Sequence, residues 1–164
     1  GRFYLDLFPR PFKYGHAAEF TILSSKRIDS EYQMPIAALV CNFPKPSKNY
    51  PSLLSHEDAE TFFHEFGHLI HDMLSKTELM SQAGTNVAMD FVEAPSQVIE
   101  NWMWNKETLN IFAKHYKTME PIPDSLIEKM IKVGGIEVEI ACRRFPAKVF
   151  LETPYDPKGL ALER

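Results

Sequence analysis

The longest regular pattern of apolar and polar positions in this chain is helical and covers about residues 55–75. The apolar residues of this segment recur at spacings of three and four and would share one helix face: Phe62, Phe66, Leu69, Ile70 and Met73. Ser55, with Asp58 three residues later, resembles a capping box, and Gly67 is the only glycine or proline inside the segment. The pattern therefore predicts a mostly buried helix.

Shorter patterns on either side predict a mixed fold. Six of the twelve prolines fall in the first 51 residues, and β-branched and aromatic residues between them predict strands at residues 2–8, about 17–28 and 35–43. After an extended piece near 81–90, helical patterns return at residues 93–105, 106–118 and 124–133. We therefore expect an α+β fold that is mainly helical, with a small N-terminal sheet.

Length, charge and cysteine content exclude several classes of function. At 164 residues and net charge −4, the chain has the size of one domain and lacks the basic surface typical of nucleic-acid or anionic-membrane binding. No apolar run approaches the roughly 20 residues of a membrane span, and no signal-peptide pattern opens the chain. Cys41 and Cys142 are isolated, which suits reduced thiols, with a single disulfide as the alternative. We expect neither nucleic acid nor membrane as a partner, and the oligomeric state is left open.

Candidate chemistry lies inside the predicted helix, where residues 64–68 read His-Glu-Phe-Gly-His, an H-E-x-x-H motif. His64 and His68 are one helical turn apart, about 6 Å along the axis at roughly 1.5 Å per residue, so both rings can reach one metal ion. Glu65 places a carboxylate beside that ion without making it a ligand, which is the arrangement of a zinc hydrolase. Since the motif fixes only three residues, a polar stripe on an ordinary amphipathic helix is the alternative.

A third metal ligand is available at Glu93, which lies 25 residues after His68. Pro95 is tolerated in the first turn of a helix, so Glu93 is expected to open the helix predicted at 93–105. Catalytic zinc typically takes three protein ligands, and two histidines with one glutamate are a known set. A helix that packs across the first would bring Glu93 to the histidine pair. The alternative is a helix-start glutamate that only complements the helix dipole.

Metal-ligating histidines usually donate their second ring N–H to a fixed acceptor. The polar residues near Glu93 in the sequence are candidates for this supporting role: Asp90, Gln97 and Glu100. The alternatives are a solvated loop acid and polar residues on a helix surface. His71 falls on the same helix face as His64 and His68 and is a further candidate. For His71, the sequence favours the alternative of a partly buried histidine that a neighbour satisfies.

A nearly continuous series of motifs covers residues 1–132: GRFYLDL at 1–7, GHAA at 15–18, AALV at 37–40, NF at 42–43, PSLL at 51–54, TFFHEFGH at 61–68, GTN at 84–86, DFVEAPSQ at 90–97 and ENW at 100–102. These motifs carry a resemblance to the catalytic core of the thimet oligopeptidase family of zinc metallopeptidases. It implies one zinc ion per chain, with His64, His68 and Glu93 as ligands and Glu65 as general base. It also implies a zincin-like fold of gluzincin type, in which the small sheet packs beside the zinc-binding helix pair.

The same resemblance implies a metalloendopeptidase that hydrolyses short peptides. Zinc activates the attacking water, and Glu65 takes its proton. In the family one edge of the sheet can pair with an extended substrate backbone. Gly84 and Thr85 are candidates for that contact, although the sequence alone favours an ordinary turn at these two residues. The expected location is cytoplasmic, and a mitochondrial or other organellar parent chain is the alternative.

The resemblance ends near Gly134. The expected core is therefore residues 1–132, with short strands in 1–52 and mainly helices in 53–132, whereas 133–164 is a divergent segment whose fold the sequence leaves open. Gly1 in place of a methionine indicates a piece of a longer chain.

In the family, a Gly-rich loop with a histidine and tyrosines that stabilise the oxyanion lies well beyond the DFVEAPSQ stretch, and no such loop precedes Arg164. Loss of one oxyanion donor commonly costs roughly 10²–10³-fold in rate. A zinc-binding fragment of the same fold that is catalytically silent is therefore the alternative function. A metal-free helical interaction domain is a third hypothesis.

Overall fold

The structure is a computed structural model that describes residues 1–134, 136–140 and 143–147, with side chains up to residue 131. It divides into two compact units, Gly1–Asn105 and Lys106–Arg164. Helices and strands occur together, so the α+β class predicted from the sequence is confirmed. None of the helices in the described ranges is long and apolar enough to cross a membrane.

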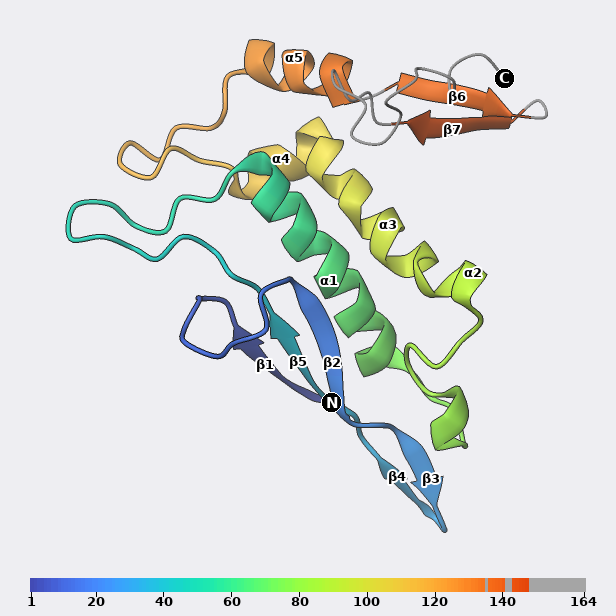
Figure 1. Ribbon diagram of the computed structural model, residues 1–164. Coiled ribbons are helices and arrows are strands. Elements are labelled where there is room, and N and C mark those ends of the chain that lie inside the picture. The colour runs from blue at the N-terminus through green and yellow to red at the C-terminus, as the bar shows by residue number, and fades with distance from the viewer. Residues whose placement is uncertain (135, 141–142, 148–164) are drawn as a thin grey trace, which may run out of the picture. The chain divides into compact units, whose positions relative to one another are not determined.

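The first unit contains a three-stranded sheet with the strand order β1-β5-β2 (Figure 1). Its central strand β5 (Ile36–Val40) pairs in parallel with β1 (Arg2–Asp6) and antiparallel with β2 (Ala18–Leu23). All three strands fall inside the ranges predicted from β-branched and aromatic content. The predicted segment 17–28 is split, since β3 (Lys26–Ile28) leaves this sheet and pairs with β4 (Glu31–Gln33), which the sequence pattern did not indicate.

Helix α1 (His56–Leu74) packs on one face of this sheet and confirms the predicted helix at 55–75. Ser55 and Asp58 form the predicted capping box, because each side chain accepts a hydrogen bond from the other residue's backbone N–H. The core between α1 and β5 is built of buried side chains from both elements and from the segment that follows β5: Ala37, Leu39, Cys41, Phe43 and Leu69. Phe62, Phe66 and Met73 pack against it from the apolar helix face.

A second helical segment lies alongside α1 (Figure 1) and consists of α3 (Ala94–Glu100) and a 3₁₀ turn at Asn101–Trp104. Together they confirm the helix predicted at 93–105. The prediction of extended chain at 81–90 is wrong. This region contains a 3₁₀ turn at Met80–Gln82 and helix α2 (Met89–Val92), and Gly84 between them has φ +57°.

The second unit contains α4 (Lys106–Phe112), α5 (Asp124–Gly134) and a hairpin of β6 (Ile136–Ile140) and β7 (Arg143–Ala147). Helix α5 confirms the prediction at 124–133. The helix predicted at 106–118 is wrong beyond residue 112, because the chain folds back so that Lys114 bridges Pro121. Met119 turns with φ +60° in this segment.

The predicted domain boundary between residues 132 and 133 stays a prediction. The part of the C-terminal segment formed by residues 148–164, and Cys142 with it, lies outside the described residues.

Candidate metal centre

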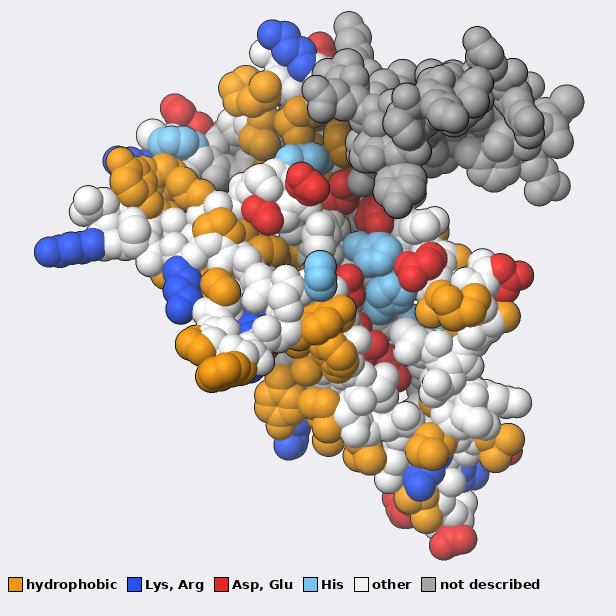
Figure 2. All heavy atoms as spheres, viewed as in Figure 1, with side chains coloured by type: hydrophobic (Ala, Val, Ile, Leu, Met, Phe, Trp, Pro, Cys, Tyr) orange, Lys and Arg blue, Asp and Glu red, His pale blue; other side chains and the backbone are white. Residues whose placement is uncertain are grey.

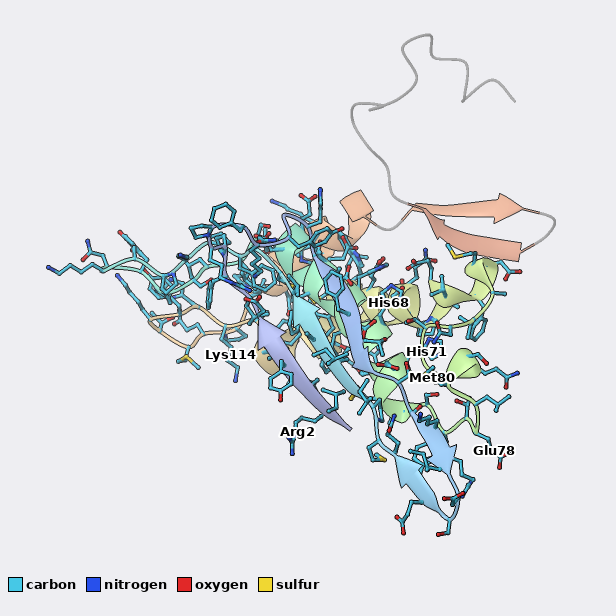
Figure 3. All side chains as sticks on the ribbon, turned by 60° about the horizontal axis from the view of Figure 1, so that its bottom comes forward. Arg2, His68, His71, Glu78, Met80 and Lys114 are labelled. Carbon is cyan, nitrogen blue, oxygen red and sulfur yellow. The ribbon has the colours of Figure 1, made fainter. Side chains whose placement is uncertain are left out.

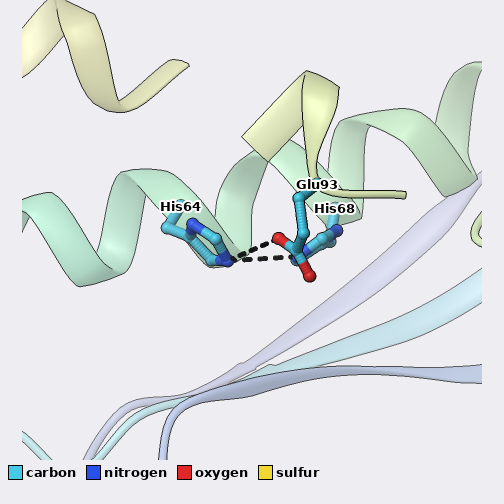
Figure 4. Close-up of side chains that lie close together, drawn as sticks. All are labelled: His64, His68 and Glu93. Atoms are coloured by element: carbon cyan, nitrogen blue, oxygen red, sulfur yellow. Dashed lines mark hydrogen bonds and ion pairs between the residues drawn. The ribbon is translucent and has the colours of Figure 1, made fainter. Parts of the chain in front are cut away.

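Three side chains from two helical elements meet beside the sheet (Figure 4). The Nε2 atoms of His64 and His68 are 3.2 Å apart. The Oε2 atom of Glu93 lies 3.1 Å from each of them. Among the described residues, these three form the one group of three or more His, Cys, Asp and Glu whose donor atoms all lie within 4.8 Å of one another.

Local structure explains why these atoms converge. His64 and His68 are four residues apart in α1 and project from the same face of the helix. Glu93 is the N-cap residue of α3, with a proline in the first turn, as the position of Pro95 predicted. The Ser96 hydroxyl, which is fully buried, lies 2.8 Å from Glu93 Oε2 and 2.9 Å from the Glu93 carbonyl oxygen. The carboxylate is therefore held from its own helix while it faces the two rings.

The second ring nitrogens of the two histidines differ in their surroundings. His64 Nδ1 lies 2.5 Å from Glu100 Oε1, so one of the candidate acceptors predicted from the sequence is in contact with the pair. His68 is only 9% exposed, and its Nδ1 is buried with no hydrogen-bond partner in the part of the chain that the structure describes. A buried imidazole nitrogen without a partner is costly, so the position of the His68 ring is not explained by a hydrogen bond at Nδ1.

The remaining supporting candidates differ from Glu100. Asp90 and Gln97 are exposed, and among the described residues neither side chain forms a hydrogen bond or ion pair with the two histidines. His71 lies beyond His68 along α1 (Figure 3), with its ring against Phe91. Burial lowers the pKa of His71, and the nearby His68 adds to this effect. A supporting role for these three residues stays a prediction.

Glu65 faces strand β2, where the backbone N–H of Glu19 donates a hydrogen bond to its Oε2 over 2.9 Å. The Glu19 side chain enters the same space. The pKa of the Glu19 carboxyl is raised to about 7, mainly by burial and in addition by the negative charge of Asp72. Asp72 is itself 1% exposed, and burial raises its pKa too. The side of α1 that faces β2 is therefore acidic and poorly hydrated.

The candidate centre opens into a depression of about 350 Å³. The residues that line it come from β2, α1 and the segment around α2: Ala17, Ala18, Glu19, His64, Glu65, His68, Thr85, Met89, Val92 and Glu93. None of them is Lys or Arg, and histidine and acidic side chains gather on the face seen in Figure 2. Thr85 thus belongs to this surface. Gly84 does not, because it is buried against Asp72 and lines a separate cavity of about 430 Å³.

Sequence reasoning did not single out Glu19, Asp72 or Ser96. Ser96 could have been found, because a serine three residues after a helix-start glutamate can reach back to it. Glu19 is one polar residue in a short strand, and its partner is 46 residues away in sequence. No local pattern carries that information.

Comparison with known proteins assigns the chain to a family. The model of peptidase family M3 matches residues 1–140. The chain belongs to peptidase family M3.

Three M3 relatives show how far the similarity extends. The chain is 48% identical to thimet-like oligopeptidase of Dictyostelium discoideum over 143 residues, which are 85% of this chain and 21% of the relative.

Over 138 residues the chain is 52% identical to saccharolysin of Saccharomyces cerevisiae, covering 83% of this chain and 19% of the relative. It is 42% identical to oligopeptidase A of Escherichia coli over 142 residues, 85% of this chain and 21% of that protein. This M3 chain therefore spans about one fifth of the length of the curated relatives it matches. The resemblance to the thimet oligopeptidase family drawn from the motifs is confirmed.

Proposed function

We propose that this chain is the metal-binding core of a zinc-dependent metallopeptidase that hydrolyses short peptides. The observation that carries the proposal is the triangle of donor atoms formed by His64, His68 and Glu93, whose sides are 3.1, 3.1 and 3.2 Å. Membership of family M3 supports the same reaction class, and so do the names of the relatives, which include two oligopeptidases.

The donor set fits zinc. Four ligands placed tetrahedrally at about 2.0–2.1 Å from zinc are about 3.3–3.4 Å from one another, close to the separations of the three atoms here. At such distances, the lone pairs of the two imidazole nitrogens and the carboxylate oxygen point at the same place. The two rings can supply at most two N–H groups to pair with these lone pairs. A divalent cation would satisfy all three at once.

Two hydrogen-bonding neighbours support the proposed ligands. A carboxylate at His64 Nδ1 favours the tautomer with its proton on Nδ1, which leaves the Nε2 lone pair free for a metal. Glu100 supplies that carboxylate at 2.5 Å. Ser96 acts on Glu93 in the same way, since its hydroxyl fixes the carboxylate oxygen that faces the rings.

Bound zinc supplies Lewis acidity, which polarises a peptide carbonyl and lowers the pKa of water towards about 7. The other steps belong to this chain's own residues. Glu65 accepts the proton of the attacking water and delivers it to the leaving amine, a role typically worth roughly 10²–10⁴-fold. The hydrogen bond from the Glu19 N–H orients this carboxylate. A zincin-like fold of gluzincin type, with β2 beside the centre, is part of the proposal.

The proposed substrate is a short peptide that lies in the depression, where Thr85 borders the centre. We keep the cytoplasm as the proposed location, with an organellar parent chain as the alternative, because the relatives include mitochondrial intermediate peptidases. The silent-fragment alternative gains no support from the comparisons.

Metal analysis of the freshly purified chain tests the proposal. We expect about one zinc per chain, lost in His64→Ala and kept in His115→Ala, since His115 is an exposed histidine of the second unit. Hydrolysis of an internally quenched peptide should stop on adding a chelator and return with zinc. Absence of zinc from the unaltered chain, even after incubation with the ion, would contradict the metal centre.

A further inference from the structure

Gly67, inside the H-E-x-x-H motif, lies where the backbones of α1 and α3 are in close contact. A Cβ atom at this position would lie 2.5 Å from Ser96 Cα and 3.0 Å from both the Pro95 carbonyl oxygen and the Ser96 nitrogen. All three neighbours are backbone atoms, which cannot rotate away as the end of a side chain could. The helices can therefore keep this separation only while residue 67 lacks a side chain.

The residue that Gly67 touches is the residue that holds Glu93. Ser96 is fully buried at the crossing, and its Oγ lies 2.8 Å from Glu93 Oε2. That same oxygen is 3.1 Å from the Nε2 atoms of both histidines. A shift of α3 away from α1 would move Ser96 and Glu93 together, and the carboxylate would leave the rings.

A second contact fixes the far end of the crossing. The Trp104 indole N–H donates to Glu60 Oε1 over 2.8 Å, and the Trp104 ring packs edge-on against His56. This end of the helical segment is tied by side chains, which adjust to small displacements. The end that carries Glu93 is set by backbone contact at Gly67, which does not adjust.

We propose that Gly67 and Ser96 are positioning residues that place the carboxylate of Glu93, the third metal ligand, against the two histidines. Gly67 fixes the distance between the two helices. Ser96 lies on α3 at this contact, and its hydroxyl holds the Glu93 carboxylate at the position that this distance allows. The inference rests on the proposed function, since it gives the two residues a role in binding the same metal. It makes the glycine of the motif as necessary for a three-ligand centre as the two histidines that flank it.

Helix propensity predicts the opposite outcome for Gly67→Ala, which makes this substitution informative. Alanine is a better helix former than glycine inside α1. If Gly67 had no role at the crossing, its replacement by alanine would therefore stabilise the helix. If the crossing controls Glu93, the alanine variant instead keeps its helices and loses the third ligand.

The test measures zinc affinity by competition with a chromophoric chelator, together with the visible spectrum of the cobalt-substituted chain, which reports the ligand set. We expect Gly67→Ala to bind zinc about 10–100-fold more weakly, the range found when the support of a metal ligand is removed. Its cobalt spectrum should match that of Glu93→Ala. The double variant Gly67→Ala/Glu93→Ala should bind no more weakly than Glu93→Ala alone, because both changes remove the same ligand.

Two further variants keep the inference falsifiable. Gly15→Ala is the matched control, because a Cβ at Gly15 meets nothing within 4 Å, and it should leave affinity and spectrum unchanged. If Gly67→Ala fails to fold by far-UV circular dichroism, Ser96→Ala decides, since it only removes a hydroxyl. Ser96→Ala should weaken zinc binding by about 10-fold or more. Combined with Glu93→Ala, it should cause no further loss of zinc affinity.

Two results would overturn the inference while leaving the proposed function intact. One is a folded Gly67→Ala or Ser96→Ala that binds zinc within about twofold of the unaltered chain, with an unchanged cobalt spectrum. The other is an effect that adds in full to that of Glu93→Ala. Failure of the unaltered chain to bind zinc would overturn the metal centre and this inference together.

Discussion

The backbone N–H of Glu19 in β2 donates a hydrogen bond of 2.9 Å to the Oε2 atom of Glu65 in α1. This bond joins the edge strand of the sheet to the acid that follows the first histidine of the motif. Strand β2 therefore has two functions in the proposed enzyme, since it borders the depression and it orients the general base. The position of that base depends on how the sheet packs against the helix, and not on α1 alone.

Glu65→Gln should keep zinc and lose hydrolysis. The glutamine side chain retains an oxygen that can accept the Glu19 N–H, but it cannot take a proton from water. We expect about one zinc per chain and a fall in kcat of about 10²–10⁴-fold. Metal analysis and cleavage of a quenched peptide check this. Glu57→Gln, at an exposed residue in the first turn of α1, is the matched control and should keep both properties. Full activity in Glu65→Gln would remove Glu65 from the mechanism.

Glu19→Gln should change how stability depends on pH. The folded state raises the Glu19 pKa from 4.5 to about 7, so between these values the native chain holds a proton that the unfolded chain releases. Stability therefore falls as pH rises through this window, by up to about 1.4 kcal/mol per pH unit for one proton. Glutamine removes this contribution and should stabilise the chain at pH 8 relative to the unaltered protein.

Urea denaturation between pH 5 and 8 measures this slope. Part of it should remain in Glu19→Gln, because Asp72 is also buried with a raised pKa and contributes with the same sign. Glu31→Gln, at an exposed residue of β4, should keep the full slope. Equal slopes in Glu19→Gln and the unaltered chain would show that Glu19 is not the titrating group.

The sequence predicted those parts of the site that depend on local spacing. Helix α1, its capping box and the shared face of His64 and His68 follow from a period of 3.6 residues and from hydrogen bonds within one turn. The start of α3 at Glu93 follows from Pro95. These features are decided by residues close together in the chain, so a single sequence is enough to find them.

The sequence could not predict contacts between segments far apart in the chain. The hydrogen bond between Glu19 and Glu65 depends on the register of β2 beside β5 and on the packing of α1, neither of which leaves a local pattern. The region near 81–90 was predicted as extended chain because Gly84 breaks the helical pattern. Its actual path follows from tertiary contacts, including a hydrogen bond from the Gly84 N–H to Ser75 Oγ of 3.0 Å.

Gly84→Ala should destabilise the first unit. Gly84 has φ +57°, where a Cβ costs about 1–2 kcal/mol, and the added atom would overlap the buried Asp72 carboxylate and lie 3.1 Å from Asp72 Cα. We expect the free energy of unfolding to fall by about 2–4 kcal/mol. Gly15→Ala, with open space around it and no positive φ, should be neutral or raise stability by about 0.4–1 kcal/mol. Equal effects of the two changes would contradict this account of Gly84.

Phe12 is held in the left-handed region, with φ +63°, and its side chain is fully exposed. This conformation destabilises the folded state by about 1–2 kcal/mol, and no packing of the phenylalanine ring offsets the loss. The loop keeps this shape because the buried Lys13 ammonium beside it donates to the carbonyl oxygens of Asp6, Phe8 and Cys41. Phe12→Gly removes the strain, although glycine makes the unfolded chain more flexible by about 0.5–1 kcal/mol.

The balance predicts that Phe12→Gly raises the free energy of unfolding by up to about 1 kcal/mol. Chemical denaturation of the two chains checks the sign. Phe3→Gly is the matched control, because Phe3 is also partly exposed but lies inside strand β1, where glycine weakens the strand and should lower stability. If both glycine variants lose stability to the same extent, then the flexibility of the unfolded chain outweighs the strain at residue 12.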